Sequence, residues 1–507
     1  MMGTSRRKKS AYNIISSMVG QLITIALGIV IPRMFLVNFG SEVNGLLGSV
    51  NQIYIYLALL EAGVGTATLQ ALYKPVALQD KKRISGIISA TNIFYRKTGI
   101  LYLCGVLILS FLYPLFISSE IGYGTIVAIF LINGIPGVVN FLFQGKFRIL
   151  LQSEGKQYIL TNLSTACTIM VNVSRIILMA LGANVIVVQS GYLIFNLLQM
   201  LFIMFYIHRH YKWINLKEEP DYKSISQKNS VLVQQVCDLI FRNTDVLILT
   251  IFCDLKVVSI YTIYTMLFSM ISTFLDNFSQ GFSFALGQIF NVDRKRYVEL
   301  RDIYETYRIT LVFALYSIAD TFILPFLRLY TDGVKDINYI DKWLPELFII
   351  TYLLSCGRAN AAADINYAQH FKKTQWRAVL EAIINLTVSL ICVNVWGIYG
   401  VLFGTIAALL YRANDMIIYA NTKILHRKPW RTYKTWVINL VVYVGVKILF
   451  SRIPLELNSY FQIIGSAVIV GMVTMLIFFS IISICNPRMF GACIYLKGNI
   501  GKRKNQR

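Results

Sequence analysis

Three charged side chains occur within one apolar stretch near the middle of the chain. Residues 230–252 are long enough and apolar enough to cross a bilayer, yet they contain Asp238, Arg242 and Asp245. The spacing of these residues places all three on one face of a helix, with Gln234 one turn earlier. Because a charged side chain at the bilayer centre costs roughly 2.5–3.5 kcal/mol to insert, this face must look into a helix bundle or a wet cavity.

The charges on this face do not cancel. Arg242 lies one helical turn from Asp238 and one turn from Asp245. If Arg242 forms an ion pair with one of these aspartates, the other carboxylate has no partner on this face. A structural role needs only one pair, so the surplus indicates either a further cation, such as Arg33 or Arg358, or a site for a proton or sodium ion. Structural and functional interpretations stay open for Asp238 and Asp245, and the functional one is favoured for Arg242.

The composition predicts a protein with many membrane spans. Of 507 residues, 56% are hydrophobic and 14% are charged, and mean hydropathy is +0.60. The net charge of +23 comes from short Lys and Arg clusters between apolar runs, which favours membrane topology over nucleic-acid binding as its explanation. The eight Cys and four His lack metal-ligand spacing, so we expect no metal, disulfide framework or cofactor.

Hydropathy predicts an all-α polytopic membrane protein with about 14 transmembrane helices. The apolar runs span residues 12–37, 44–69, 98–118, 123–145, 158–181, 184–207, 230–252, 257–287, 308–327, 344–366, 376–394, 397–420, 435–453 and 461–484. Nearly all basic residues fall in alternate loops, and the other loops hold only Lys256, Arg328, Lys335, Lys342 and Arg452. The positive-inside rule therefore predicts that both termini are cytoplasmic, with an uncleaved first helix.

A pattern of charged residues occurs twice. Asp80 begins the sequence Asp-Lys-Lys-Arg, with Glu61 upstream, and Asp293 begins Asp-Arg-Lys-Arg, with Asp276 upstream. We interpret this as a repeat of six helices, which gives two pseudo-symmetric lobes and two added C-terminal helices. The expected parts are 1–229, 230–430, and 431–507 with its basic tail.

Further ionisable residues lie inside the predicted spans, and several have plain structural explanations. Arg412 and Asp415 are three apart and are expected to pair within their helix, whereas Glu381 and Lys447 are expected to snorkel from helix ends. The rest are Arg33, Glu61, Arg175, Asp276, Asp320, Arg358 and Asp364. In addition, residues 81–91 have the spacing of an amphipathic segment on the membrane surface, although topology explains their basic residues as well.

Catalytic motifs are missing from the sequence. It contains no GxxxxGK[ST], GxSxG or HExxH pattern, and the loops expected outside are too short for a folded catalytic domain. We therefore expect that the protein is not an enzyme.

Short sequence motifs are distributed over about the first 420 residues. They are Pro32-Arg33, residues 40–46 (GSEVNGL), 61–65 (EAGVG), 72–75 (LYKP), 243–245 (NTD), 258–264 (VSIYTIY), 370–375 (HFKKTQ), 381–385 (EAIIN) and 397–405 (GIYGVLFGT). These motifs resemble those of bacterial polysaccharide-unit flippases, which serve O-antigen, capsule and exopolysaccharide synthesis. That family belongs to the multidrug/oligosaccharidyl-lipid/polysaccharide exporter superfamily.

This resemblance implies an alternating-access carrier in the cytoplasmic membrane. Its substrate would be an undecaprenyl-diphosphate-linked oligosaccharide, its partners would include membrane lipids and a polysaccharide polymerase, and H⁺ or Na⁺ could drive it. Arginine suits a diphosphate because its planar fork binds two oxygens. The expected substrate-binding residues are Arg33, Arg242, Arg358 and Arg175, and the expected coupling or gating residues are Asp238, Asp245, Glu61 and Asp276. Arg33, Asp245 and Glu61 fall within the matching motifs. The roles of Arg242, Asp238 and Arg358 rest on the argument from buried charge alone.

Three alternatives to this function stay open. A non-transporting assembly scaffold would tolerate the loss of every buried charge as long as it folded. An ion-coupled multidrug antiporter would share the fold. A membrane glycan polymerase or ligase would be an enzyme, and such an enzyme usually needs a larger outer loop than this chain has.

Overall fold

The structure, a computed structural model, describes residues 2–61, 64–117, 119–222, 243–368, 370–451, 457–487 and 491, with side chains from residue 27 onward apart from a few interior positions. Asp238 and Arg242 lie outside the described residues. The chain divides into two compact units, Met1–Ile263 and Tyr264–Arg507. The lobe boundaries expected from the repeat stay predictions, since this division follows contacts and not symmetry.

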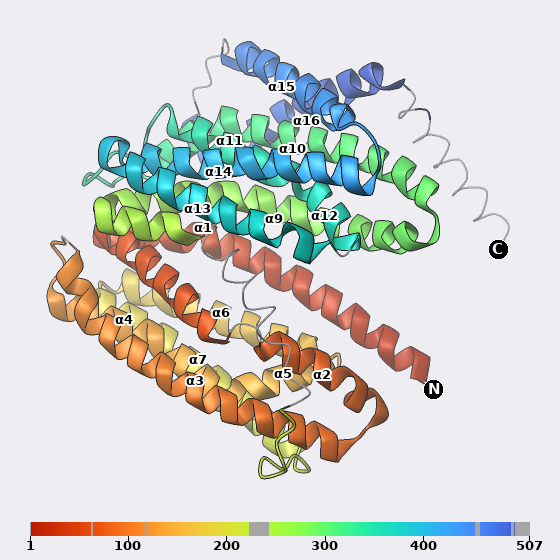
Figure 1. Ribbon diagram of the computed structural model, residues 1–507. Coiled ribbons are helices and arrows are strands. Elements are labelled where there is room, and N and C mark those ends of the chain that lie inside the picture. Colours follow the sequence, from red (N-terminus) through yellow and green to blue (C-terminus); the bar gives the residue numbers. More distant parts are fainter. Residues whose placement is uncertain are drawn as a thin grey trace. The chain divides into compact units, whose positions relative to one another are not determined.

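The first unit consists of helices throughout its described part (Figure 1). They are α1 (Met2–Leu57), a 3₁₀ turn (Ala58–Glu61), α2 (Val64–Leu78), α3 (Lys81–Phe116), α4 (Tyr123–Val139), a π-helical turn (Asn140–Gln144), α5 (Gly145–Ser153), α6 (Gln157–Ala180), α7 (Val185–His210), the helix Asn243–Phe252 and the start of α9 (Leu255–Val292).

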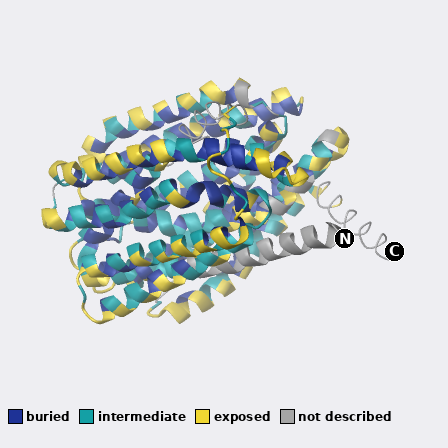
Figure 2. Cartoon of the chain, turned by 90° about the horizontal axis from the view of Figure 1, so that it is seen from below, coloured by how far each residue is buried: buried dark blue, intermediate teal, exposed yellow. Residues whose placement is uncertain are grey.

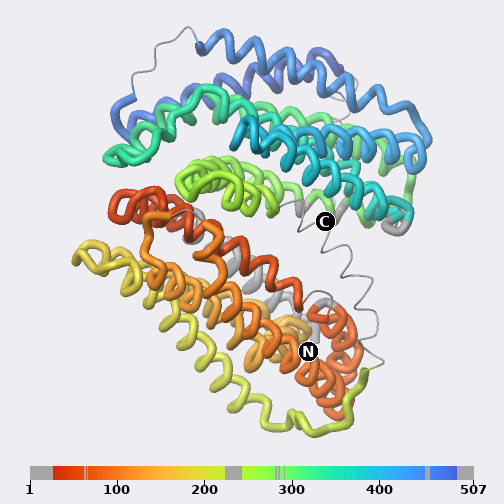
Figure 3. Tube along the Cα trace, turned by 60° about the vertical axis from the view of Figure 1, so that its left-hand side comes forward, coloured from red at the N-terminus to blue at the C-terminus, as the bar shows by residue number. Residues whose placement is uncertain are grey.

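The second unit is likewise helical where it is described. After the rest of α9 come α10 (Arg294–Tyr330), α11 (Leu344–Gly357), α12 (Ala359–Tyr367), α13 (Phe371–Trp396), α14 (Ile398–Tyr419), a π-helical turn (Ala420–Ile424), α15 (Trp430–Ser451) and α16 (Tyr460–Cys485). Helices α13 and α14 pack side by side (Figure 3). The predicted all-helical membrane fold is confirmed.

Eleven helices in the described residues are long and apolar enough to cross a membrane. Two breaks and one partly described run account for the larger number that hydropathy predicts. Gly40, with a φ of 81°, kinks α1 between the apolar runs 12–37 and 44–69. Arg358 separates α11 from α12 within the apolar run 344–366. The run at 230–252 is described only from residue 243.

The two copies of the charged pattern have the same local structure. The side chain of Asp80 accepts a hydrogen bond of 3.0 Å from the Arg83 backbone N–H, and Asp293 accepts one of 3.0 Å from Arg296. Each aspartate therefore caps the amino end of a long helix, α3 or α10. Helix capping explains the aspartate at the start of both copies.

The apolar face at the start of α3 is buried within the chain. Ile84, Ile87 and Ile88 are at most 3% exposed. The loop after α7 covers this part of the helix, where the Asp221 N–H donates to the Gly86 carbonyl at 3.1 Å and the Ser89 hydroxyl donates to the Leu216 carbonyl at 3.0 Å. The amphipathic-surface interpretation is therefore wrong, because the chain itself buries the apolar face.

Exposed residues recur along the helices (Figure 2), and many of them are large and apolar. On α16, for example, Ile464 is 63% exposed and Leu476 is 68% exposed. Such faces are expected where a helix meets lipid.

Candidate functional site

A cavity of about 320 Å³ lies within the second unit. Three helices line it, namely α9, α10 and α12. Its charged and polar walls are Asp276, Ser279, Ser283, Tyr297, Arg301, Tyr304, Arg308, Asn360, Asp364 and Tyr367. A membrane-spanning unit with this many charges around one cavity is a candidate for binding a polar ligand.

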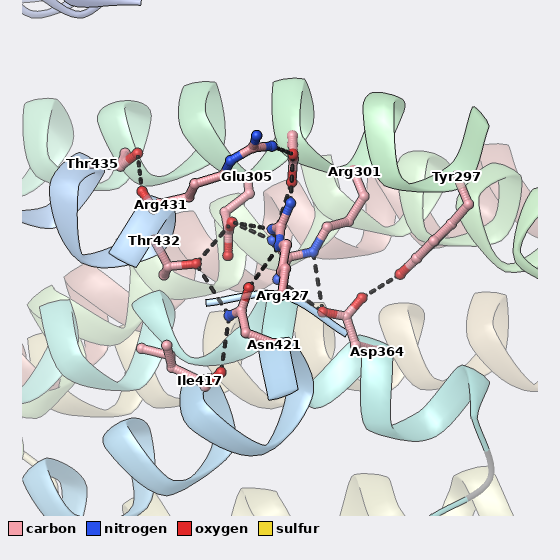
Figure 4. Close-up of polar contacts among 11 residues, drawn as sticks. Tyr297, Arg301, Glu305, Asp364, Ile417, Asn421, Arg427, Arg431, Thr432 and Thr435 are labelled. Carbon is pink, nitrogen blue, oxygen red and sulfur yellow. Dashed lines mark hydrogen bonds and ion pairs between the residues drawn. The ribbon is translucent and has the colours of Figure 1, made fainter. Parts of the chain in front are cut away.

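Arg301 is fully neutralised at one wall of the cavity. Its guanidinium is 2% exposed and donates to Asp364 Oδ2 from Nη2 at 2.8 Å and from Nε at 3.1 Å. It also pairs with Glu305 one turn along α10, and the Tyr297 hydroxyl donates to Asp364 (Figure 4). These contacts join α10 to α12.

The same cluster extends to the connection before α15. Arg427 pairs with Asp302 at 2.6 Å and donates to Asn421 at 2.8 Å, while Arg431 pairs with Asp302 at 3.1 Å. The Thr432 hydroxyl donates to Glu305 at 3.1 Å. Since the cluster's three arginines balance its three carboxylates, we interpret it as a clamp that holds α10, α12 and the start of α15 together (Figure 4).

Arg308 differs from Arg301 in its partners. It is 3% exposed, and its Nε donates to the Ser279 hydroxyl at 2.9 Å and its Nη1 to the Cys356 carbonyl at 2.7 Å. Both acceptors are neutral, and no carboxylate in the described part of the chain lies within ion-pair distance of Arg308. Asp276, on the same cavity, is exposed. The cavity therefore holds a buried cation with no direct counter-ion among the described residues.

Arg358, a predicted substrate-binding residue, belongs to a separate chain of ion pairs. It pairs with Glu381 of α13, which also lies 3.3 Å from Arg412 of α14. Arg412 pairs with Asp415 at 2.8 Å within the helix, as predicted from their spacing, and Arg377 completes the chain at Asp415. Glu381 is only 5% exposed, so the prediction that it snorkels is wrong: two arginines hold it inside.

Lys447 is also paired. It contacts Asp320 at 2.9 Å and Glu346, and the Tyr443 hydroxyl donates to Asp320 at 3.0 Å. This group joins α10, α11 and α15 within the second unit.

Glu61, a predicted coupling residue, lies in the first unit. It ends the 3₁₀ turn before α2 and accepts a hydrogen bond from the Tyr95 hydroxyl of α3. A Cβ atom at Gly65 would lie 3.2 Å from Glu61 Oε1. A larger residue at position 65 would therefore crowd the carboxylate, and glycine avoids this contact. Arg148 of α5 is near enough to interact with this carboxylate electrostatically.

Arg175 has aromatic and amide neighbours in the first unit. Its Nη2 donates to the Gln189 side chain at 2.7 Å, and its guanidinium carbon lies 5.7 Å from the ring centre of Phe35 and 5.5 Å from that of Tyr192. Arg33 is half-buried on α1, two residues before Phe35. Both arginines are thus placed on helices of the first unit, but their role in substrate binding stays a prediction.

Asp245 is the member of the central charged face that the structure describes. It is 4% exposed and accepts a hydrogen bond of 2.7 Å from the Tyr261 hydroxyl. The neighbouring Thr244 shares a hydrogen bond of 2.7 Å with Tyr56 of α1. Burial and hydrogen bonding hold this carboxylate in place within the first unit.

The sequence analysis missed Arg301, Arg308 and Asn360 as site residues. Helix α10 begins at Arg294, well before the apolar run that starts at residue 308, so Arg301 was assigned to a loop. The N-cap at Asp293 was the signal that could have extended the helix.

No family model matches the sequence, and no curated protein matches it. The fold, however, matches solved structures. The lipid II flippase MurJ, in an inward closed conformation, is 13% identical with a TM-score of 0.70, and the match covers 93% of this chain and 98% of MurJ. An inward-facing multidrug resistance MATE family transporter is 14% identical with a TM-score of 0.61, over 82% of this chain and 98% of that protein.

A third match is a transporter of the MOP superfamily from Pyrococcus furiosus, 14% identical with a TM-score of 0.54, over 83% of this chain and 96% of that one. Identities this low show the architecture alone. The chain therefore has the fold that the flippase MurJ and the MATE transporters share within the MOP exporter superfamily.

Proposed function

We propose that this protein transports an undecaprenyl-diphosphate-linked oligosaccharide across the cytoplasmic membrane for surface polysaccharide synthesis. The observation that carries the proposal is the likeness to the flippase MurJ, which extends over 93% of this chain. The likeness to a MATE transporter is weaker, with a TM-score of 0.61 over 82% of the chain. The sequence resemblance to polysaccharide-unit flippases favours the same class of substrate.

The chemistry of the described residues supports an anionic substrate. Arg308 and Arg175 lie within membrane helices and bond to neutral groups, with no carboxylate paired to either in the described part of the chain. A guanidinium is costly to hold in a membrane protein without a counter-charge. A diphosphate would supply that charge, and a planar fork binds its oxygens in pairs.

The proposed mechanism is alternating access. Arg33 and Arg242 bind the diphosphate in turn, and Asp238 and Asp245 release Arg242 when they bind a proton or sodium ion. Arg358, Arg175, Glu61 and Asp276 serve as further substrate-binding or coupling residues. The carrier moves its substrate without altering it, both termini face the cytoplasm, and a polysaccharide polymerase receives the product.

The test is made in cells that lack the gene. Surface polysaccharide is assayed together with the side of the membrane on which lipid-linked oligosaccharide accumulates. We expect loss of the polymer and accumulation on the cytoplasmic side, both restored by the wild-type gene and not by Arg242→Gln. Export by Arg242→Gln at the wild-type level would contradict the role of this arginine.

The same assay separates the flippase from a multidrug antiporter and from a glycan polymerase or ligase. Normal polysaccharide, combined with lost resistance to cationic drugs, would replace the flippase with a multidrug antiporter. Accumulation of the unpolymerised unit on the outer side would instead indicate a glycan polymerase or ligase.

A further inference from the structure

The cavity of the second unit presents hydrogen-bond donors that the described chain leaves unused. Arg308 is 3% exposed, its Nε and Nη1 donate to Ser279 and the Cys356 carbonyl, and its Nη2 donates to no group in the described residues. Arg301, on the same cavity, is by contrast saturated by Asp364 and Glu305. The positive charge available to a ligand is therefore that of Arg308.

Asn360 provides a second, independent observation. Its side chain lines the cavity, is 6% exposed, and its buried Nδ2 has no acceptor in the described part of the chain. A buried donor without an acceptor lowers stability, and proteins rarely retain one. An acceptor from outside the chain would satisfy this amide and the Arg308 guanidinium together.

The other walls indicate what such an acceptor carries. Ser279, Ser283 and Tyr304 line the cavity, and Tyr304 and Tyr367 add aromatic residues to its walls. Asp276 is an exposed carboxylate on the same cavity, with no ion pair among the described residues. It would repel an anion placed beside it, but it can accept hydrogen bonds from hydroxyl groups.

We propose that Arg308 and Asn360 bind a phosphate group inside the second unit, and that this phosphate belongs to a sugar phosphate whose hydroxyls bond to Asp276. The assignment to the substrate's own sugar diphosphate rests on the proposed function. A volume of about 320 Å³ is near the lower end of ligand cavities, which hold roughly 300–1,000 Å³. The site therefore takes the phosphate end of the ligand and not a whole oligosaccharide.

The test is a binding assay on the full-length protein in phosphatidylcholine nanodiscs, with inorganic pyrophosphate and farnesyl diphosphate as probes. We expect Arg308→Gln to weaken pyrophosphate binding by about tenfold or more, since it removes a charged donor. Arg296→Gln is the matched control, because Arg296 lies on the same helix but is exposed. This variant should bind pyrophosphate as tightly as the wild type does.

Asn360→Leu distinguishes the loss of a binding group from a loss of folding stability. It removes a donor that bonds to nothing in the described residues, so thermal stability should stay equal or rise while pyrophosphate binding weakens. Equal binding of pyrophosphate by the wild type, Arg308→Gln and Asn360→Leu would overturn the site, as would failure of the wild type to bind either probe.

A second arm identifies the source of the phosphate. If phosphatidylglycerol added to the nanodiscs displaces pyrophosphate, the site stands and membrane lipid occupies it; if only farnesyl diphosphate does so, the ligand is a prenyl diphosphate. The cell assay of polysaccharide export tests the proposed function independently of the binding assay, which tests the site. Export by the wild type with unaltered binding in both variants would overturn the site alone, and binding without any role in export would overturn the function alone.

Discussion

The hydroxyl of Tyr95 in α3 donates a hydrogen bond to the carboxylate of Glu61, the residue that ends the 3₁₀ turn before α2. This bond joins the first two candidate membrane spans of the described residues, Leu27–Glu61 and Lys81–Phe116. It also fixes the direction of a carboxylate that the sequence nominates for coupling.

Tyr95→Phe removes this donor and keeps the ring, which is fully buried. We expect a loss of about 1–3 kcal/mol of stability, because the carboxylate loses its partner in a buried setting. Thermal melts of the purified protein measure the effect. Glu61→Gln combined with Tyr95→Phe should cost less than the sum of the two single changes, and strict additivity would show that the pair does not interact.

Arg301→Met tests the clamp of the second unit. It leaves Asp364 and Glu305, at 1% and 5% exposure, without their arginine. Breaking a buried ion pair in this way typically costs about 3–5 kcal/mol, so the variant should show a sharply lowered melting temperature or yield little folded protein. Arg431→Gln is the control: its side chain is 65% exposed, so its loss should change stability by less than about 1 kcal/mol. A melting temperature for Arg301→Met equal to that of Arg431→Gln would refute the clamp.

The sequence predicts contacts within a helix far better than contacts between helices. Arg412 and Asp415 are three residues apart, and helix geometry alone brings them together at 2.8 Å. Arg358 and Glu381 are 23 residues apart on different helices, and nothing in their spacing indicates that they meet. Hydropathy located the helices because lipid requires apolar faces, but it placed Arg301 in a loop because the polar first turns of α10 extend beyond the apolar run.

Gly45 lies where two helices of the first unit approach each other closely. A Cβ atom there would be 1.7 Å from the carbonyl oxygen of Leu255, so alanine requires the backbones to separate. We expect Gly45→Ala to lower the melting temperature markedly and to reduce transport. Gly445→Ala, in α15, meets nothing within 4 Å and should be neutral or stabilising. Equal melting temperatures for the two variants would show that the first unit can relax around Gly45.

Asp276→Asn tests the balance of charge at the cavity of the second unit. The carboxylate shares this cavity with Arg308, so its removal should strengthen binding of inorganic pyrophosphate, which bears no hydroxyl groups of a sugar. Because Asp276 is exposed and screened by solvent, we expect a gain of about two- to fivefold, which corresponds to less than about 1 kcal/mol. Titration at low and high salt measures it, and the gain should shrink as salt rises. Weaker pyrophosphate binding by Asp276→Asn would mean that this carboxylate orients Arg308 instead of opposing the ligand. Polysaccharide export by the same variant reports separately on coupling, because a carboxylate that must bind a proton or sodium ion during transport cannot be replaced by an amide.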